Sequence, residues 1–182
     1  MIHHSTFIGQ LASIYKPNIY VELGLYEGET LKKVQPFAHN LYGVDIKSNE
    51  YLEQLNNIPN ITITYKSTDS FFESFDKKID MAFIDADHNY NSVLRDFENV
   101  YSRLNQNGII ILHDTDPEDD RLIHPSYCGD SYRIVNEFEK RDDINIVTIP
   151  IVEAGLSIIT KKNSTRTNIR HSTVSLISPS WK

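Results

Sequence analysis

Seven short apolar runs, rich in Ile, Val and Tyr, recur along this chain and alternate with segments of helical spacing. This alternation constrains the fold most, because strands joined through helices form a mainly parallel sheet covered on both faces. The sequence therefore predicts a Rossmann-like α/β fold with a seven-stranded, mainly parallel sheet. No helical segment separates the last two runs, which favours an antiparallel hairpin at one edge. The predicted strands are residues 19–23, 41–44, 61–65, 79–84, 108–112, 144–149 and 156–159.

The clearest predicted helix precedes the fifth strand. Its apolar residues recur at the spacing of one helical face, and a turn is predicted at residues 105–108, directly after it. The residues of that face are Val93, Leu94, Phe97, Val100, Tyr101 and Leu104. Weaker helical patterns cover residues 6–15, 29–37, 48–56, 69–75 and 131–141.

Length and composition indicate a single globular domain. The 182 residues, 40% of them hydrophobic, suit one domain over residues 1–162, followed by a polar tail at 163–182. The net charge of −7 without a basic cluster argues against nucleic-acid binding. Cys128 is the single cysteine, which excludes an internal disulfide. With no signal-peptide pattern and no apolar run of ~20 residues, we expect a cytoplasmic protein that binds no membrane.

The segment after the first predicted strand has the features of a ligand-binding loop. Gly24 and Gly28 lie between this strand and a predicted helix, where glycine lets a ligand approach the backbone and the helix N-terminus favours an anionic group. Glu22 ends the strand with the opposite charge and suits an ammonium group. Together these residues predict a site for an amino-acid moiety.

The next two strand ends extend this site. Asp45, followed by Ile46, closes the second strand, where its carboxylate suits the hydroxyls of a ribose. Asp69 follows the third strand and adds a polar group that suits a base. The dinucleotide fingerprint G-x-G-x-x-G is absent. An amino acid, a ribose and a base in one crevice indicate S-adenosyl-L-methionine rather than a nicotinamide dinucleotide.

Carboxylates also follow the fourth and fifth predicted strands. Asp85 and Asp114 end neighbouring strands, so we expect them to converge. We also expect Asp85 to contribute to the cofactor site. Two carboxylates this close call for a cation, and oxygen ligands favour Mg²⁺, Mn²⁺ or Ca²⁺. His113 is either a third ligand or a strand-end histidine bonded to the backbone, and both alternatives stay open.

One histidine lies beside the predicted cation site. His88 follows Asp85 by three residues, and its ordinary pKa suits proton removal near neutral pH, so we assign it the role of general base. Asp87 is read as a cap of the next helix. The remaining histidines, which we assign to the surface or to packing, are His3, His4, His39, His124 and His171.

With these motifs, residues 10–162 resemble the class I S-adenosylmethionine-dependent methyltransferases. The narrower resemblance is to the metal-dependent O-methyltransferase branch, which includes macrocin- and mycinamicin-type sugar O-methyltransferases and cephalosporin hydroxylase-like proteins. It is carried by residues 21–24 with Gly28 and Thr30, residues 83–90 leading to Asp96, and residues 108–114. The resemblance implies that Glu22, Gly24, Asp45 and Asp69 hold the cofactor, Asp85 and Asp114 the metal, and that His88 deprotonates the acceptor. His113 departs from the sugar enzymes, which carry an acid there.

The activity expected from this reading is methyl transfer to a vicinal diol or catechol hydroxyl, with residues 116–129 forming one wall of the acceptor site. A metal-dependent hydroxylase is an alternative, favoured by the His/Asp pair. A cofactor- or glycan-binding module without turnover is another, and a nicotinamide dehydrogenase is the least favoured. A second copy of the chain that completes the site also stays open.

Overall fold

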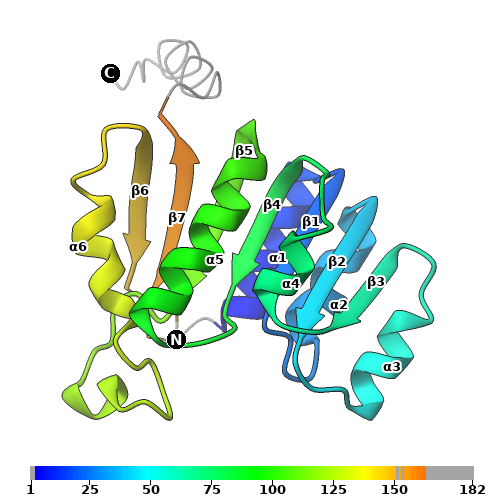
Figure 1. The fold of residues 1–182 in the computed structure, drawn as a ribbon, viewed down its shortest axis with the longest axis horizontal. Coiled ribbons are helices and arrows are strands. Elements are labelled where there is room, and N and C mark those ends of the chain that lie inside the picture. The colour runs from blue at the N-terminus through cyan, green and yellow to red at the C-terminus, as the bar shows by residue number, and fades with distance from the viewer. Residues whose placement is uncertain (1–2, 151, 153, 163–182) are drawn as a thin grey trace, which may run out of the picture.

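A computed structural model describes residues 3–150, 152 and 154–162 of the chain. Within them lies a seven-stranded sheet of order β3-β2-β1-β4-β5-β7-β6, in which the first five strands are parallel and β7 is antiparallel to both its neighbours (Figure 1). This confirms the predicted sheet and its antiparallel edge. The strands are β1 Ile19–Leu23, β2 Asn40–Asp45, β3 Ile61–Tyr65, β4 Ile79–Ile84, β5 Leu104–His113, β6 Ile144–Ile149 and β7 Leu156–Lys161.

Helices cover both faces of the sheet (Figure 1). One core packs Phe71, Phe97 and Phe138 from α4, α5 and α6 against one face. The other core packs Ile8 and Leu31, with Leu52, from α1, α2 and α3 against the opposite face. The helices are α1 His4–Tyr15, α2 Glu29–Val34, α3 Glu50–Asn56, α4 Thr68–Phe72, α5 Tyr90–Arg103 and α6 Ile134–Phe138.

Helix α5 confirms the clearest predicted helix, but its two ends differ from the prediction. Asn89, rather than Asp87, is its N-cap, and the Asn89 side chain accepts a hydrogen bond from the Asn91 N–H. The predicted turn at 105–108 is wrong, because β5 begins at Leu104, which pairs with Ile79. The Asn105 side chain donates to Asp80 at 2.6 Å and so satisfies a polar group in this irregular part of the strand.

Two weaker helical predictions are interrupted in the structure. Residues 29–37 form α2 and then a 3₁₀ turn, Gln35–Phe37, in which Pro36 has no N–H to continue the α-helical pattern. Residues 131–141 form a 3₁₀ turn, Ser131–Arg133, and then the short α6. The predicted tail at 163–182 and His171 lie outside the described residues. A search of the described helices finds none that is long and apolar enough to cross a membrane.

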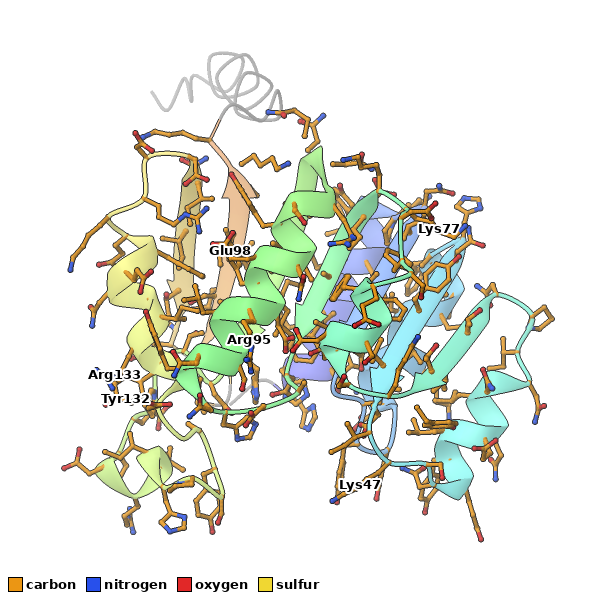
Figure 2. All side chains as sticks on the ribbon, in the orientation of Figure 1. Lys47, Lys77, Arg95, Glu98, Tyr132 and Arg133 are labelled. Carbon is orange, nitrogen blue, oxygen red and sulfur yellow. The ribbon has the colours of Figure 1, made fainter. Side chains whose placement is uncertain are left out.

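The parallel strands end at one edge of the sheet. In Figure 2 this edge is the lower one, where Lys47 follows β2 and where Tyr132 and Arg133 lie, whereas Lys77, which precedes β4, lies at the upper edge. The loops after β1, β2, β4 and β5 therefore lie at the same edge. These are the loops that carry the predicted ligand-binding residues.

Candidate active site

Asp45 connects the loop after β2 to the loop after β1. Its Oδ2 accepts hydrogen bonds from the backbone N–H groups of Leu25 (2.9 Å) and Tyr26 (3.2 Å), and its Oδ1 accepts one from Lys47 (2.9 Å). A carboxylate offers about four lone-pair positions, so these bonds leave about one for a ligand. For Asp45 to accept hydrogen bonds from two ribose hydroxyls, at least one of these N–H groups would have to lose its hydrogen bond to the carboxylate.

The two glycines of the β1–α2 loop accommodate protein atoms. At Gly24 (φ +83°) a Cβ would lie 2.1 Å from the carbonyl oxygen of Asp85. At Gly28 (φ +73°) it would lie 2.5 Å from Cδ1 of Leu55. The observed reason for both glycines is therefore close packing against the β4 loop and α3, whereas their predicted contact with a ligand stays a prediction.

Glu22 is buried beneath this loop and does not line its surface. Its side chain accepts a hydrogen bond from the Tyr20 hydroxyl at 2.7 Å, and the residue is 1% exposed. Burial raises the pKa of Glu22 to about 8; the Tyr20 hydrogen bond opposes this shift and the charge of Asp85 adds to it. The observed partner of the Glu22 carboxyl group is the Tyr20 hydroxyl, and its contact with a ligand's ammonium group stays a prediction.

The other two predicted cofactor residues differ in their surroundings. Ile46 is 73% exposed beside Asp45, so an apolar surface borders the carboxylate that was predicted to meet a ribose. Asp69 belongs to α4, and its carboxylate accepts a hydrogen bond from the Asn99 side chain of α5 at 3.3 Å. The observed partner of Asp69 is thus the next helix, and a contact with a base stays a prediction.

Asp85, His113 and Asp114 meet between the ends of β4 and β5. One ligand atom from each lies within 4.8 Å of the other two. His113 Nδ1 lies 3.2 Å from Oδ1 of both aspartates. The Asp85 N–H bonds to the Leu23 carbonyl at 2.8 Å and fixes this residue against β1. The predicted convergence of the two aspartates is confirmed, and the His113 ring faces them.

Charge in this cluster is balanced by imidazoles. Burial alone would raise the pKa of Asp85, but hydrogen bonds from His113 and His88, and the charges of His113 and His4, lower it to about 2. The hydrogen bond and charge of Asp85, together with the charge of Asp114, raise the pKa of His88 against the opposing effect of burial. The cluster therefore keeps Asp85 ionised and able to bind a cation.

His88 also contacts the two aspartates of the cluster. Its Nε2 is 3.3 Å from Asp114 Oδ2 and 3.7 Å from Asp85 Oδ1, and its Nδ1 contacts the Tyr127 carbonyl oxygen. Both ring nitrogens face acceptors, an arrangement that favours the doubly protonated imidazole. Because that form has no free lone pair, the predicted role of His88 as a base requires that Nε2 first release its proton.

The segment after β5 supports both His88 and Asp114. Cys128 Sγ donates to Asp114 Oδ1 at 3.4 Å, and Ser131 Oγ donates to the Asp114 carbonyl at 3.1 Å. At Gly129 (φ +55°) a Cβ would lie 2.3 Å from the His88 carbonyl oxygen. Both Cys128 and Ser131 are buried. Nothing in the sequence pattern indicated these supporting contacts, because they depend on how the loop folds back.

The other histidines are also placed by the structure. His4, assigned above to the surface or to packing, lies with its ring centroid 4.4 Å from that of His113. His3 packs against His4, and His124 packs against Tyr127. His39 is exposed and precedes β2 at the opposite edge.

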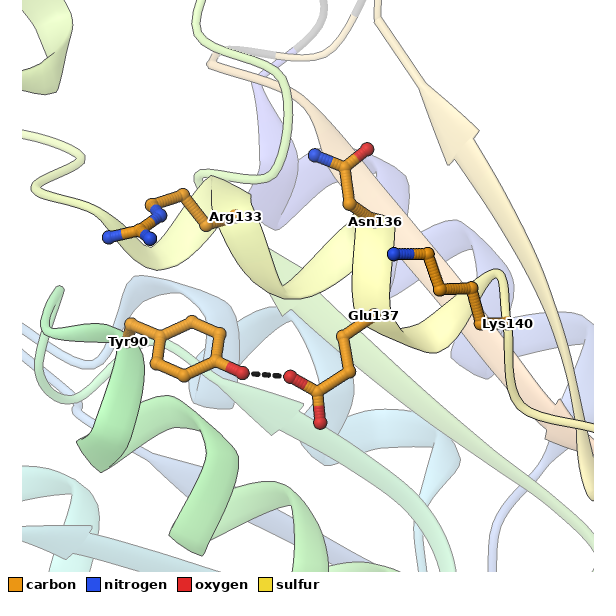
Figure 3. Close-up of a pocket in the computed structure, with 5 residues that line it drawn as sticks. All are labelled: Tyr90, Arg133, Asn136, Glu137 and Lys140. Carbon is orange, nitrogen blue, oxygen red and sulfur yellow. Dashed lines mark hydrogen bonds between the residues drawn. The ribbon is translucent and has the colours of Figure 1, made fainter.

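Two cavities lie near the site without including the carboxylate cluster. One, of about 320 Å³, lies between α5 and α6, where the Tyr90 hydroxyl donates to Glu137 (Figure 3). The second, of about 610 Å³, lies in the segment after β5 and is lined in part by the exposed side chains of Ile123 and Tyr127. The second cavity falls within the loop that was predicted to form an acceptor wall.

Comparison with solved structures matches the whole fold at low sequence identity. An SAH-bound methyltransferase from Podospora anserina has a TM-score of 0.71 at 15% identity, covering 88% of this chain and 78% of that one. The O-methyltransferase TomG from Streptomyces achromogenes, in complex with SAM, has a TM-score of 0.68 at 14% identity, with 87% and 79% covered. These likenesses show the fold.

Sequence comparison identifies the family. "Uncharacterized protein R132" of Acanthamoeba polyphaga mimivirus is 29% identical in an alignment 134 positions long, which covers 61% of this chain. The chain spans 58% of that relative's length. The profile described as "Methyltransferase domain" matches residues 21–115, which include the last three residues of β1, the Asp85 loop and Asp114. Because this match covers more than half of the 182 residues, the chain belongs to the methyltransferase domain family.

Proposed function

We propose that this protein is an S-adenosyl-L-methionine-dependent, divalent-metal-assisted O-methyltransferase that acts on a hydroxyl of a vicinal diol in a sugar or another small molecule. One observation carries the proposal: Asp85, His113 and Asp114 converge at the sheet edge that also holds Asp45 and the β1–α2 loop. Membership of the methyltransferase domain family supports the donor, and the mixed carboxylate and imidazole cluster supports the cation.

We place the adenosyl group of the donor beside Asp45. S-adenosyl-L-methionine would supply the methyl group as a sulfonium. Asp45 offers its remaining acceptor position to a ribose hydroxyl, and the exposed Ile46 side chain offers apolar surface for an adenine ring. Burying a large exposed isoleucine is favourable, so the exposure of Ile46 accords with a ligand face at this point.

The cluster at β4 and β5 fits a divalent cation. The two carboxylates suit Mg²⁺, Mn²⁺ and Ca²⁺, and the imidazole favours Mn²⁺ among these three ions. A bound cation would lower the pKa of an acceptor hydroxyl and stabilise the alkoxide. Asp85, His113 and Asp114 would hold that cation, and Cys128 and Ser131 would hold Asp114 in place.

His88 is the group we propose to receive the acceptor's proton. Its Nδ1 is fixed against the Tyr127 carbonyl, which leaves Nε2 as the nitrogen that exchanges protons. That nitrogen lies next to Asp114, close to the cluster that would orient the acceptor. The cavity next to Tyr127 is the space we propose for the remainder of the acceptor.

Methyl transfer from labelled S-adenosyl-L-methionine tests the proposal. The acceptors are a panel of sugars and catechols, measured with Mg²⁺ and with EDTA. We expect labelled product that depends on Mg²⁺ and is lost in Asp85→Asn, which weakens the cluster. Asp76→Asn is the matched control, because Asp76 is exposed and precedes β4 at the opposite edge of the sheet.

Two results would contradict the proposal. Equal product formation in EDTA would remove the metal from it. Binding of S-adenosylhomocysteine by calorimetry, with no labelled product from any acceptor, would favour a binding module without turnover.

A further inference from the structure

The first turn of α1 contacts the carboxylate cluster through His4. The His4 ring centroid lies 4.4 Å from that of His113 and 5.6 Å from that of Phe83. Phe83 in turn lies 6.1 Å from His113 in an edge arrangement. The His113 ring is therefore packed against rings from α1 and β4, while its Nδ1 faces the two aspartates.

The position of His4 is itself fixed by the packing of α1. Ser5 is fully buried, and Lys33 of α2 donates to the side chains of Ser5 (2.9 Å) and Thr6 (3.0 Å). Ile8, one turn further along the helix, is fully buried in the core. His3 caps the helix by accepting the Ser5 N–H at 3.3 Å. The His4 ring is thus held in place by a rigid helix.

This packing matters because a histidine ring alone does not select its orientation. Rotation about the terminal torsion of His113 has broad wells, and a half-turn would move Nδ1 away from Asp85 and Asp114. Contacts on the flanks of the ring restrict that rotation.

We infer that His4 is a positioning residue of the candidate metal centre, whose ring holds His113 with Nδ1 facing Asp85 and Asp114. The inference rests on the proposed metal-assisted function and extends it to a helix outside the segment that matches the family profile. Residues that orient a metal-binding histidine typically change metal affinity about 10- to 100-fold when they are lost.

Manganese affinity of the full chain, measured by calorimetry and by the loss of the free Mn²⁺ spectrum in electron paramagnetic resonance, tests this inference without an activity assay. We expect His4→Ala to weaken Mn²⁺ binding about 10-fold or more. His4→Phe keeps a ring against His113 and should bind Mn²⁺ within about twofold of the original chain. His39→Ala is the matched control, because that histidine is exposed at the opposite edge of the sheet.

Each variant is measured at a temperature below its own unfolding midpoint. Binding of S-adenosylhomocysteine reports whether the donor site is intact. If His4→Ala does not fold, His4→Leu replaces it in the same comparison with His4→Phe. Unchanged Mn²⁺ affinity in His4→Ala, or equal losses in Ala and Phe variants, would overturn the positioning role while leaving the proposed function in place. An original chain that binds S-adenosylhomocysteine but no Mn²⁺ would overturn both.

Discussion

Glu22 should make the stability of this protein fall as the pH rises. The carboxyl group is 1% exposed and its pKa is raised from 4.5 to about 8, mainly by burial. The folded protein therefore keeps a proton that the unfolded chain loses above about pH 4.5. Because the folded state binds more protons between these values, the free energy of unfolding decreases with pH across that window.

The size of the effect follows from the shift. Each pKa unit corresponds to about 1.4 kcal/mol, so the full shift amounts to roughly 5 kcal/mol, of which we expect about 2–5 kcal/mol to be measurable. Glu22→Gln resembles the protonated side chain and keeps an acceptor for the Tyr20 hydroxyl. Its stability should exceed that of the original chain by less than about 1 kcal/mol near pH 5 and by about 2–5 kcal/mol at pH 8.

Urea unfolding followed by circular dichroism at pH 5, 6, 7 and 8 measures this difference, since groups that titrate identically in both proteins cancel. Glu27→Gln is the control, because Glu27 is exposed in the same loop. Stability curves for the original chain and Glu22→Gln that stay parallel from pH 5 to pH 8 would refute the reasoning.

Three further results are expected at the candidate site. Gly24→Ala should lose about 4 kcal/mol or more of unfolding free energy in urea, since its Cβ would lie 2.1 Å from a backbone oxygen; native-like stability would contradict this packing. His88→Ala should keep S-adenosylhomocysteine affinity in calorimetry but lose turnover about 10²-fold or more, and unchanged turnover would remove its role as base. Asp45→Asn should weaken S-adenosylhomocysteine binding about 10-fold, as expected for a charged hydrogen bond, whereas Glu22→Gln should change it less than about threefold. The reverse order would identify Glu22, rather than Asp45, as the stronger ligand of the donor.

The strands were predictable where local pattern and tertiary environment agree. Four of them, β1, β3, β4 and β6, have the predicted bounds. The apolar runs of β1 and β4 are also buried runs, whereas β3 and β6 combine buried residues with exposed ones. The segment at 105–108 was predicted as a turn from its asparagines and glycine. Its strand conformation is accompanied by the hydrogen bond from Asn105 to Asp80, which no local pattern reveals.

The same division holds at the candidate site. The meeting of Asp85 with Asp114 follows from the order of the strands, and sequence reasoning found it. The burial of Glu22, by contrast, depends on which face of β1 lies under α2, and the contact of His4 with His113 depends on where α1 docks. Both features depend on long-range packing, which the sequence around each residue does not indicate.

The hydrogen bonds of the segment after β5 determine which part of it can be replaced to change the acceptors that the protein uses. Asp130 accepts the Tyr90 N–H at 2.7 Å, and Cys128 and Ser131 hold Asp114, so residues 128–131 are tied to the groups proposed to do the chemistry. A chimera that imports a foreign loop should therefore have its junctions inside residues 117–127. A transplant that also replaces residues 128–131 would exchange the catalytic apparatus together with the selectivity.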